Sequence, residues 1–215
     1  HSSIVARGVQ RALVVADLPF MSYHVSPEEG LRSAGRLMQE TGVAAVKLEG
    51  GVRAAETIER VVRAEIPVMG HIGLTPQSFH RMGGHKVQGR NDLQERRLKA
   101  DAKAVESAGA FAIVLEGMPS EVAAEITDSL AIPTIGIGAG PQCSGQVLVM
   151  HDLLGITPLR GETSPKFVKA FAGLRETVIK AANSFVAEVR EGSYPDQAHS
   201  YSRRSRSKTA LRSVT

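Results

Sequence analysis

The sequence contains few of the residues that several classes of protein require. It has one cysteine, Cys143, and no tryptophan, and aromatic residues make up only 4% of its 215 residues. A single cysteine excludes an internal disulfide bond, which fits a reducing compartment, and we expect a cytoplasmic protein. So few aromatic side chains argue against a base-stacking surface, so we expect no nucleic-acid partner. No apolar run reaches the length of about 20 residues that a membrane span needs, and we expect no membrane partner.

The positive charge of the chain is concentrated at one end. The formal net charge is +4, but residues 202–215 hold five basic and no acidic side chains, which leaves 21 basic against 22 acidic residues elsewhere. A segment rich in serine and arginine predicts a disordered end, and the alternative is a contact with an anion or a nucleic acid. We therefore predict one domain over 1–192 and a carboxy-terminal extension over 193–215, disordered from about residue 202.

Short apolar runs, each followed by charged residues, histidine or glycine, occur six times along the sequence. Such runs, rich in β-branched residues, are typical of parallel strands that are buried on both faces. Strands that alternate with helices predict a parallel α/β sheet. The apolar runs span 12–16, 43–46, 66–69, 111–115, 132–137 and 147–150, and helix patterns span 26–40, 54–64, 92–107, 120–130 and 165–191.

Two architectures compete for this pattern, a doubly wound open sheet and a (β/α)₈ barrel. No Gly-x-Gly-x-x-Gly turn follows the first run, and polar residues follow nearly every run instead of one switch point. Both observations favour the barrel, although only six of its eight strands are found. The polar, glycine-containing segment 75–90 is long for a connection, which favours a lid or binding loop over a surface excursion.

Charged residues at the ends of the predicted strands are the candidate site. Lys47 and Glu49 are two residues apart, so on a strand they point to the same side. Asp17 ends the preceding strand, and two carboxylates from neighbouring strands can hold a hard cation such as Mg²⁺. The alternative is an ion pair between Lys47 and an acidic residue at the rim of the barrel.

Further candidates follow the later strands. Glu116 ends an apolar strand, where burial would raise its pKa and suit it to act as a general base, the alternative being a helix cap. A lone histidine such as His71 is more often a structural hydrogen-bonding residue, but its placement beside the other candidates favours a functional role. Glycines in 136–140 would let the backbone approach a ligand. For His151 and Asp152 we favour a hydrogen bond at the rim.

Six ordered segments within residues 1–201 resemble one family, the ketopantoate hydroxymethyltransferases (3-methyl-2-oxobutanoate hydroxymethyltransferases). Six motifs in the same order make the resemblance highly specific. The segments are Asp17-Leu-Pro-Phe-Met-Ser-Tyr23, Val46-Lys-Leu-Glu-Gly-Gly51, Gly70-His-Ile-Gly-Leu-Thr-Pro-Gln-Ser78, Gly83-Gly-His-Lys-Val-Gln-Gly-Arg90, Ile135-Gly-Ile-Gly-Ala-Gly140 and Val149-Met-His-Asp152.

The resemblance implies a TIM barrel of the phosphoenolpyruvate/pyruvate-like class and a transferase of pantothenate and coenzyme A biosynthesis. The family moves a hydroxymethyl group from 5,10-methylenetetrahydrofolate to 3-methyl-2-oxobutanoate through a Mg²⁺-stabilised enolate, which gives 2-dehydropantoate. Carried over by motif, Asp17 and Glu49 would bind Mg²⁺, and Asp17, Lys47 and His71 would bind the keto acid. Glu116 would accept the proton. The family is typically a cytoplasmic homo-oligomer, a decamer.

The sequence also departs from the family pattern. A Gly-Asp-Ser segment, with a third metal carboxylate, and a Thr-Ala-Tyr-Asp segment both belong to family strands that are not found here. We therefore expect a barrel that lacks its first two strands, folds poorly alone and binds Mg²⁺ and keto acid weakly. The alternatives are a related keto-acid barrel enzyme, either a mutase or a carbon–carbon lyase, and an inactive fragment or a binding module that uses the basic tail.

Overall fold

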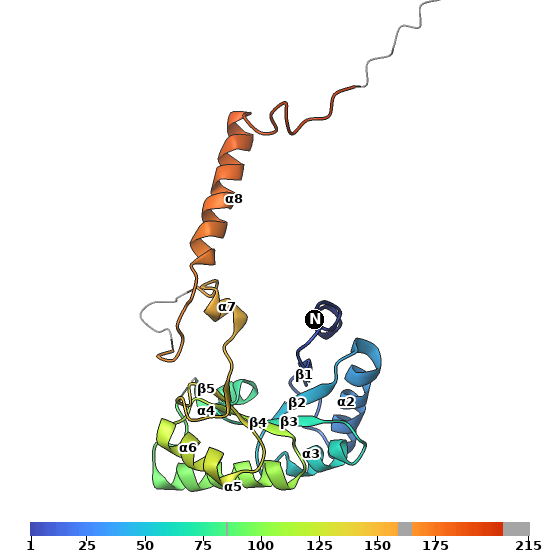
Figure 1. The fold of residues 1–215 in the computed structure, drawn as a ribbon, viewed down its shortest axis with the longest axis vertical. Helices are drawn as coiled ribbons and strands as arrows, with labels where there is room; N and C mark the ends of the chain where they lie inside the picture. Colours follow the sequence, from blue (N-terminus) through green and yellow to red (C-terminus); the bar gives the residue numbers. More distant parts are fainter. Residues whose placement is uncertain (85, 159–164, 204–215) are drawn as a thin grey trace, which may run out of the picture. The chain divides into compact units, whose positions relative to one another are not determined.

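The structure is a computed structural model that describes residues 1–84, 86–158 and 165–203 (Figure 1). The chain forms two compact units, the first made of residues 1–149 and 165–168 and the second of the remaining residues from 150 onward. The compact units divide near residue 150, and the domain over 1–192 stays a prediction. Most of the basic tail, residues 204–215, lies outside the described residues.

The first unit is built on one parallel sheet. Each strand pairs in parallel with the next one along the chain, so the sheet order equals the sequence order without a reversal. A doubly wound sheet needs a reversal, so that alternative is excluded, and the sheet is a parallel half-barrel. The six strands of the described residues are β1 (Val15–Asp17), β2 (Ala45–Glu49), β3 (Val68–Gly73), β4 (Ala112–Glu116), β5 (Thr134–Ile137) and β6 (Gly145–Gln146).

Five of the six predicted strands are confirmed with shifted ends, but the position of the last one was wrong. The prediction placed it at 147–150, whereas β6 is Gly145–Gln146 and Met150 begins the short helix α7 (Met150–Leu153). The Val147 N–H still donates a hydrogen bond to the Gly136 carbonyl at 3.0 Å, after which the chain leaves the sheet. A short apolar run does not by itself distinguish a strand from the approach to a helix.

Four predicted helices are confirmed: α2 (Pro27–Thr41), α3 (Ala55–Val62), α5 (Asp92–Ser107) and α6 (Ser120–Ser129). The Ser26 hydroxyl caps α2 by accepting a hydrogen bond from the Glu29 N–H at 3.2 Å, and Gly42 ends that helix with a φ of 73°. In the same way, the Asn91 side chain accepts a hydrogen bond from the Gln94 N–H at the start of α5. Local capping chemistry therefore fixes these helix ends.

The predicted helix over 165–191 is wrong in its first part. Helix α8 spans Leu174–Glu191, ends at the left-handed Gly192, and has no buried residue. The Phe171 and Leu174 N–H groups instead donate hydrogen bonds to the carbonyls of Leu153 and Leu154, at 2.8 and 3.1 Å. Because this backbone pairs with the segment after α7, it does not continue the helix toward Pro165. Within the described residues, no helix has the length and apolarity that crossing a membrane would require.

Short helices lie before β1 and after β3. Helix α1 (Ser2–Gly8) precedes β1, and the predicted loop 75–90 contains the 3₁₀ helix η1 (Pro76–Ser78) and helix α4 (Phe79–Met82). The loop therefore carries local structure at the carboxyl end of β3. His85 lies outside the described residues.

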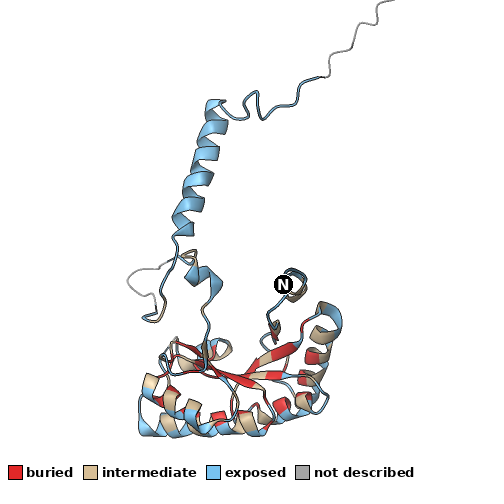
Figure 2. Ribbon diagram, in the orientation of Figure 1, coloured by how far each residue is buried: buried red, intermediate tan, exposed pale blue. Residues whose placement is uncertain are grey.

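Helices α2, α3, α5 and α6 lie against one face of the sheet, where the buried residues gather (Figures 1 and 2). Every second residue of the central strands enters this core, as a period of two along a strand requires. The core joins strand residues Val46, Leu48, Val68, Ile72, Ile113 and Leu115 to helix residues Ala34, Ile58, Val61, Leu98, Ala102, Val105, Val122, Ala123 and Ile126.

Candidate active site

The site candidates occupy the sheet face opposite the helices. Lys47 and Glu49 alternate along β2 with the core residues Val46 and Leu48, so they point away from the helices. The parallel register pairs Asp17 with Lys47, and Glu49 with His71. Glu116 ends β4 and alternates in the same way with the core residue Leu115. The structure thus brings together all five residues predicted from the sequence.

A line of polar contacts connects four of these residues across the strands. Lys47 Nζ lies 2.9 Å from Asp17 Oδ1 and 3.3 Å from His71 Nδ1. On the other side of the imidazole ring, His71 Nε2 lies 3.0 Å from Glu116 Oε2. The side chain of His71 is buried, that of Glu116 is partly buried, and that of Asp17 is half exposed. A cation, an imidazole and two carboxylates therefore form a row that opens to solvent at Asp17.

The partners of His71 make opposite demands on its ring. The Lys47 ammonium group has only donors and calls for an accepting Nδ1 with the proton on Nε2, whereas Glu49 Oε1, 3.7 Å from Nδ1, and Glu116 Oε2 attract protons to both nitrogens. Although Glu116 Oε2 is close, Nε2 has no hydrogen-bond partner of good geometry among the described residues. An unpaired buried donor costs about 1–3 kcal/mol. A polar ligand atom bound beside Nε2 would remove that cost.

Glu49 is held by a second network that the sequence reasoning missed. The Tyr23 hydroxyl accepts a hydrogen bond from the Glu49 N–H at 3.1 Å and donates one to Gln77 Oε1 at 2.9 Å. Gln77 in turn donates its N–H to Glu49 Oε2 at 3.0 Å and its Nε2 to the Leu18 carbonyl at 2.9 Å. The loops after β1, β2 and β3 are thereby joined. Tyr23 and Gln77 belong to two segments of the family resemblance, which is the signal that could have identified them.

Burial governs the proton affinity of this network. It raises the pKa of the Glu49 carboxyl group, and His71, the Gln77 N–H and Lys47 oppose this effect without cancelling it. Burial also raises the pKa of the Tyr23 hydroxyl, so that this group stays protonated and can donate to Gln77. The ionised form of Glu49 is therefore destabilised by burial, and a cation bound beside it would stabilise that form.

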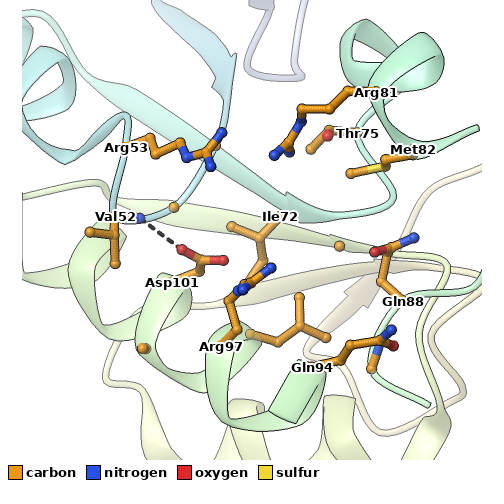
Figure 3. Close-up of a pocket in the computed structure, with 16 residues that line it drawn as sticks. Val52, Arg53, Ile72, Thr75, Arg81, Met82, Gln88, Gln94, Arg97 and Asp101 are labelled. Atoms are coloured by element: carbon orange, nitrogen blue, oxygen red, sulfur yellow. Dashed lines mark hydrogen bonds between the residues drawn. The ribbon is translucent and has the colours of Figure 1, made fainter. Parts of the chain in front are cut away.

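Two cavities adjoin the carboxyl ends of β2 and β3. The first, which we call the aromatic cavity, has a volume of 580 Å³, and its wall includes Phe20, Tyr23, His24 and Glu49. The second, the arginine cavity, has a volume of 390 Å³, and its wall includes Arg53, Arg81 and Arg97 (Figure 3). The two share Gly50, Arg53, Thr75 and Arg81 as lining residues. A ligand that reaches Glu49 in the aromatic cavity thus has the arginine cavity next to it.

Asp17 and Glu49 are the carboxylates of the site that could bind Mg²⁺. Asp17 Oδ1 pairs with Lys47, Glu49 Oε2 accepts a hydrogen bond from the Gln77 N–H, and Glu49 Oε1 lies 3.7 Å from His71 Nδ1. No other hydrogen bond to these two carboxylates is found within the described residues. One or two carboxylates plus water and substrate oxygens suffice for Mg²⁺. The described residues hold no group of three or more His, Cys, Asp and Glu side chains arranged to bind a metal. The pair therefore fits Mg²⁺ that is shared with a substrate, but not a closed protein cage.

The remaining candidates have structural surroundings. Gly138 has a φ of 62°, and a Cβ there would lie 2.6 Å from the Phe167 ring, so this glycine makes room for Phe167. At Gly140, which also has a positive φ, a Cβ would collide with Ser120. His151 and Asp152 lie in α7 of the second unit, where Asp152 Oδ1 accepts a hydrogen bond from the Thr157 hydroxyl at 2.6 Å.

The fold and the site define a parallel α/β protein with a polar site at the carboxyl edge of its sheet. The model of the family "Ketopantoate hydroxymethyltransferase" matches residues 1–197, so the chain belongs to that family. It is 55% identical over 201 residues to the 3-methyl-2-oxobutanoate hydroxymethyltransferase of Geotalea uraniireducens (strain Rf4), covering 94% of this chain and 74% of the relative. The enzyme of the same name from Pelobacter propionicus is 56% identical over 201 residues, covering 94% of this chain and 73% of the relative.

A solved structure supports the fold. The chain superimposes on the crystal structure of phosphonopyruvate hydrolase with a TM-score of 0.51, covering 94% of this chain and 69% of the other, at 14% sequence identity. Because the identity is so low, the likeness speaks for the fold alone.

Proposed function

We propose that this protein transfers a hydroxymethyl group from 5,10-methylenetetrahydrofolate to 3-methyl-2-oxobutanoate and forms 2-dehydropantoate. The observation that carries the proposal is the row Asp17, Lys47, His71 and Glu116 beside Glu49, in a chain 55% identical to an enzyme named for this reaction. The half-barrel sheet would correspond to six of the eight strands of a TIM barrel of the phosphoenolpyruvate/pyruvate-like class.

In this proposal Glu116 is the general base. Its partly buried side chain stands at the end of β4 and faces the His71 ring, so a keto acid above this row could present its C3 hydrogen to the carboxylate. Lys47 would place its positive charge at the keto oxygen, where negative charge develops as the proton leaves. Water would open the methylene bridge of the donor, breaking both of its C–N bonds, so that tetrahydrofolate leaves and the one-carbon unit is released at the oxidation level of formaldehyde. The carbanion carbon would add to that carbon, and its oxygen would take up a proton to give the hydroxymethyl group.

Asp17 and Glu49 are the residues that would hold a Mg²⁺ ion. When bound, the ion would supply positive charge beside the carboxylate and keto oxygens of the substrate. Tyr23 and Gln77 would keep Glu49 in place through the hydrogen bonds described above. His71 would turn its Nε2–H toward the substrate.

We also propose a cytoplasmic homo-oligomer. Helix α8 carries an apolar stripe at spacings of seven and four residues, in which Val178, Phe185 and Val189 are 62%, 55% and 47% exposed. A stripe of this kind on a water-soluble chain is commonly covered by another subunit. Static light scattering of the purified protein would give a mass of several chains, whereas a mass of one chain would contradict the proposal.

Deuterium exchange separates the two halves of the reaction. In D₂O with Mg²⁺ and without folate, the protein should exchange the C3 hydrogen of 3-methyl-2-oxobutanoate, followed by proton NMR. Addition of 5,10-methylenetetrahydrofolate should then yield 2-dehydropantoate. The Glu116→Gln variant should lose both activities, and exchange by this variant at the normal rate would rule out Glu116 as the base. Turnover of 2-methylisocitrate or oxaloacetate without folate would instead favour a related mutase or lyase.

A further inference from the structure

The arginine cavity has no role in the chemistry proposed above. Figure 3 shows Arg53 and Arg81 extending toward each other across the cavity, while Arg97 rises from α5 toward the same space. The three side chains come from three different segments, namely the loop after β2, helix α4 and helix α5. Their convergence is therefore a product of the tertiary structure and not of a basic run in the sequence.

The positive charge in this cavity is not neutralised by the protein. Arg32, Arg36, Arg60 and Arg63 each pair with a glutamate, but none of the three cavity arginines has an ion-pair partner among the described residues. Of the described residues that line the cavity, Asp101 alone is acidic, and its Oδ1 accepts a hydrogen bond from the Val52 N–H at 2.8 Å. Three guanidinium groups thus face one carboxylate that already has a donor.

The walls of the arginine cavity are defined by local packing. Gly51 passes so close to α5 that a Cβ there would collide with Asp101, so glycine allows the loop after β2 to form this wall. On the opposite side, Gln94 Oε1 accepts hydrogen bonds from the Gly89 and Arg90 N–H groups at 3.1 and 3.0 Å and holds the loop before α5. The three arginines of the cavity are exposed to solvent.

The position of the cavity connects it with the proposed reaction. Arg53 and Arg81 also line the aromatic cavity, whose wall includes Glu49, so a ligand bound at Glu49 could reach past these two side chains to Arg97. Lys47, His71 and Glu116 are not among the described residues that line either cavity. The one-carbon donor has the matching chemistry, because a flat pteridine and benzoyl part is followed by a chain of glutamyl carboxylates. Guanidinium groups bind carboxylates through paired, charge-assisted hydrogen bonds.

Resting on the proposed function, we propose that the arginine cavity binds the glutamyl carboxylates of the folate donor through Arg53, Arg81 and Arg97. The cavity then selects donors with a longer γ-glutamyl chain, because each added glutamyl residue brings another carboxylate into the reach of a guanidinium group. Arg97 is the specific probe of this role, since it lines the arginine cavity and not the aromatic cavity.

The test compares kcat/KM for the triglutamyl and the monoglutamyl forms of 5,10-methylenetetrahydrofolate. The Arg97→Gln variant should lower the ratio of the two values about fivefold, the size of one exposed charge-assisted contact. Arg96→Gln is the matched control, because Arg96 precedes Arg97 on α5, is exposed, and does not line the cavity. The control should keep the wild-type ratio. An unchanged ratio in Arg97→Gln, or an equal fall in both variants, would overturn the proposal.

Binding measurements separate this proposal from the reaction itself. Isothermal titration with tetrahydropteroyl-triglutamate should show weaker binding by Arg97→Gln than by Arg96→Gln, whether or not the wild type forms 2-dehydropantoate. If it forms none but keeps this difference, the proposed function fails while the cavity assignment stands. Titration with inorganic phosphate is the third arm. Arg97-dependent binding of phosphate without any Arg97 effect on the triglutamyl ligand would assign the cavity to a free anion and overturn the glutamyl proposal.

Discussion

On strand β2, Leu48 is fully buried against the helices, whereas its neighbours Lys47 and Glu49 point to the other face and make polar contacts. The same alternation separates Leu115 from Glu116 on β4, and Ile72 from His71 on β3. The helix face is apolar and packed, while the opposite face holds charged groups whose contacts are incomplete. Along one strand, alternate residues therefore stabilise the core, while the residues between them form the candidate site.

The largest effect is expected from Glu116→Gln on the polar face. Loss of the proposed base should lower the rate of C3 deuterium exchange by about 10²–10⁴-fold. Thermal unfolding should change little, because the amide has the same shape and Glu116 lies outside the hydrophobic core to which its neighbour Leu115 belongs. Unfolding of the variant at a much lower temperature than the wild type would contradict the assignment of stability to the helix face alone.

Leu48→Ala tests the helix face at a position between two site residues. Removing a fully buried leucine from the core should lower the free energy of unfolding by about 2–5 kcal/mol, measured by urea denaturation. The folded fraction should keep its deuterium-exchange rate at a temperature well below the unfolding transition. A lower exchange rate per folded molecule would show that the two faces are coupled.

Tyr23→Phe tests the network that positions Glu49. The variant removes the acceptor of the buried Glu49 N–H and the donor to Gln77, so the unfolding free energy should fall by about 1–3 kcal/mol. If Tyr23 acts by positioning Glu49, the apparent Kd for Mg²⁺ in the exchange assay should rise by a larger factor than the factor by which the exchange rate at saturating Mg²⁺ falls. Ser22→Ala is a suitable comparison, because Ser22 is only partly buried and its hydroxyl bonds locally to the Pro19 carbonyl. Equal effects of the two variants would contradict the positioning role.

The smallest effect is expected from the pH dependence of Glu49→Gln. Because burial raises the pKa of Glu49 in the folded state, folding favours the protonated carboxyl group. The wild type therefore has this contribution in full at acidic pH and loses it as the pH rises through the raised pKa. The neutral amide should make the variant the more stable protein at pH 8, with the difference vanishing near pH 4. Melting temperatures across this range would measure it, and a difference that grows toward acidic pH would contradict the burial argument.

Much of the fold could be predicted from local patterns. The caps at Ser26 and Gly42 gave the ends of α2 because capping involves only neighbouring residues. The run at 147–150 and the start of the last helix were misplaced, since pairing with distant backbone decides where strand β6 and helix α8 begin. A local pattern contains no information about such pairing.

The parallel α/β class, the placement of five polar side chains within or at the ends of strands, and membership of the family all follow from the amino-acid sequence alone. They do so because strand periodicity and ordered motifs are properties of the chain that need no spatial neighbour. Only the tertiary structure decided that His71 lies between Lys47 and Glu116, that Tyr23 and Gln77 hold Glu49, and that arginines of three segments meet in one cavity. These relations depend on which strands pair and which loops meet, and that is settled by the packing of the whole sheet.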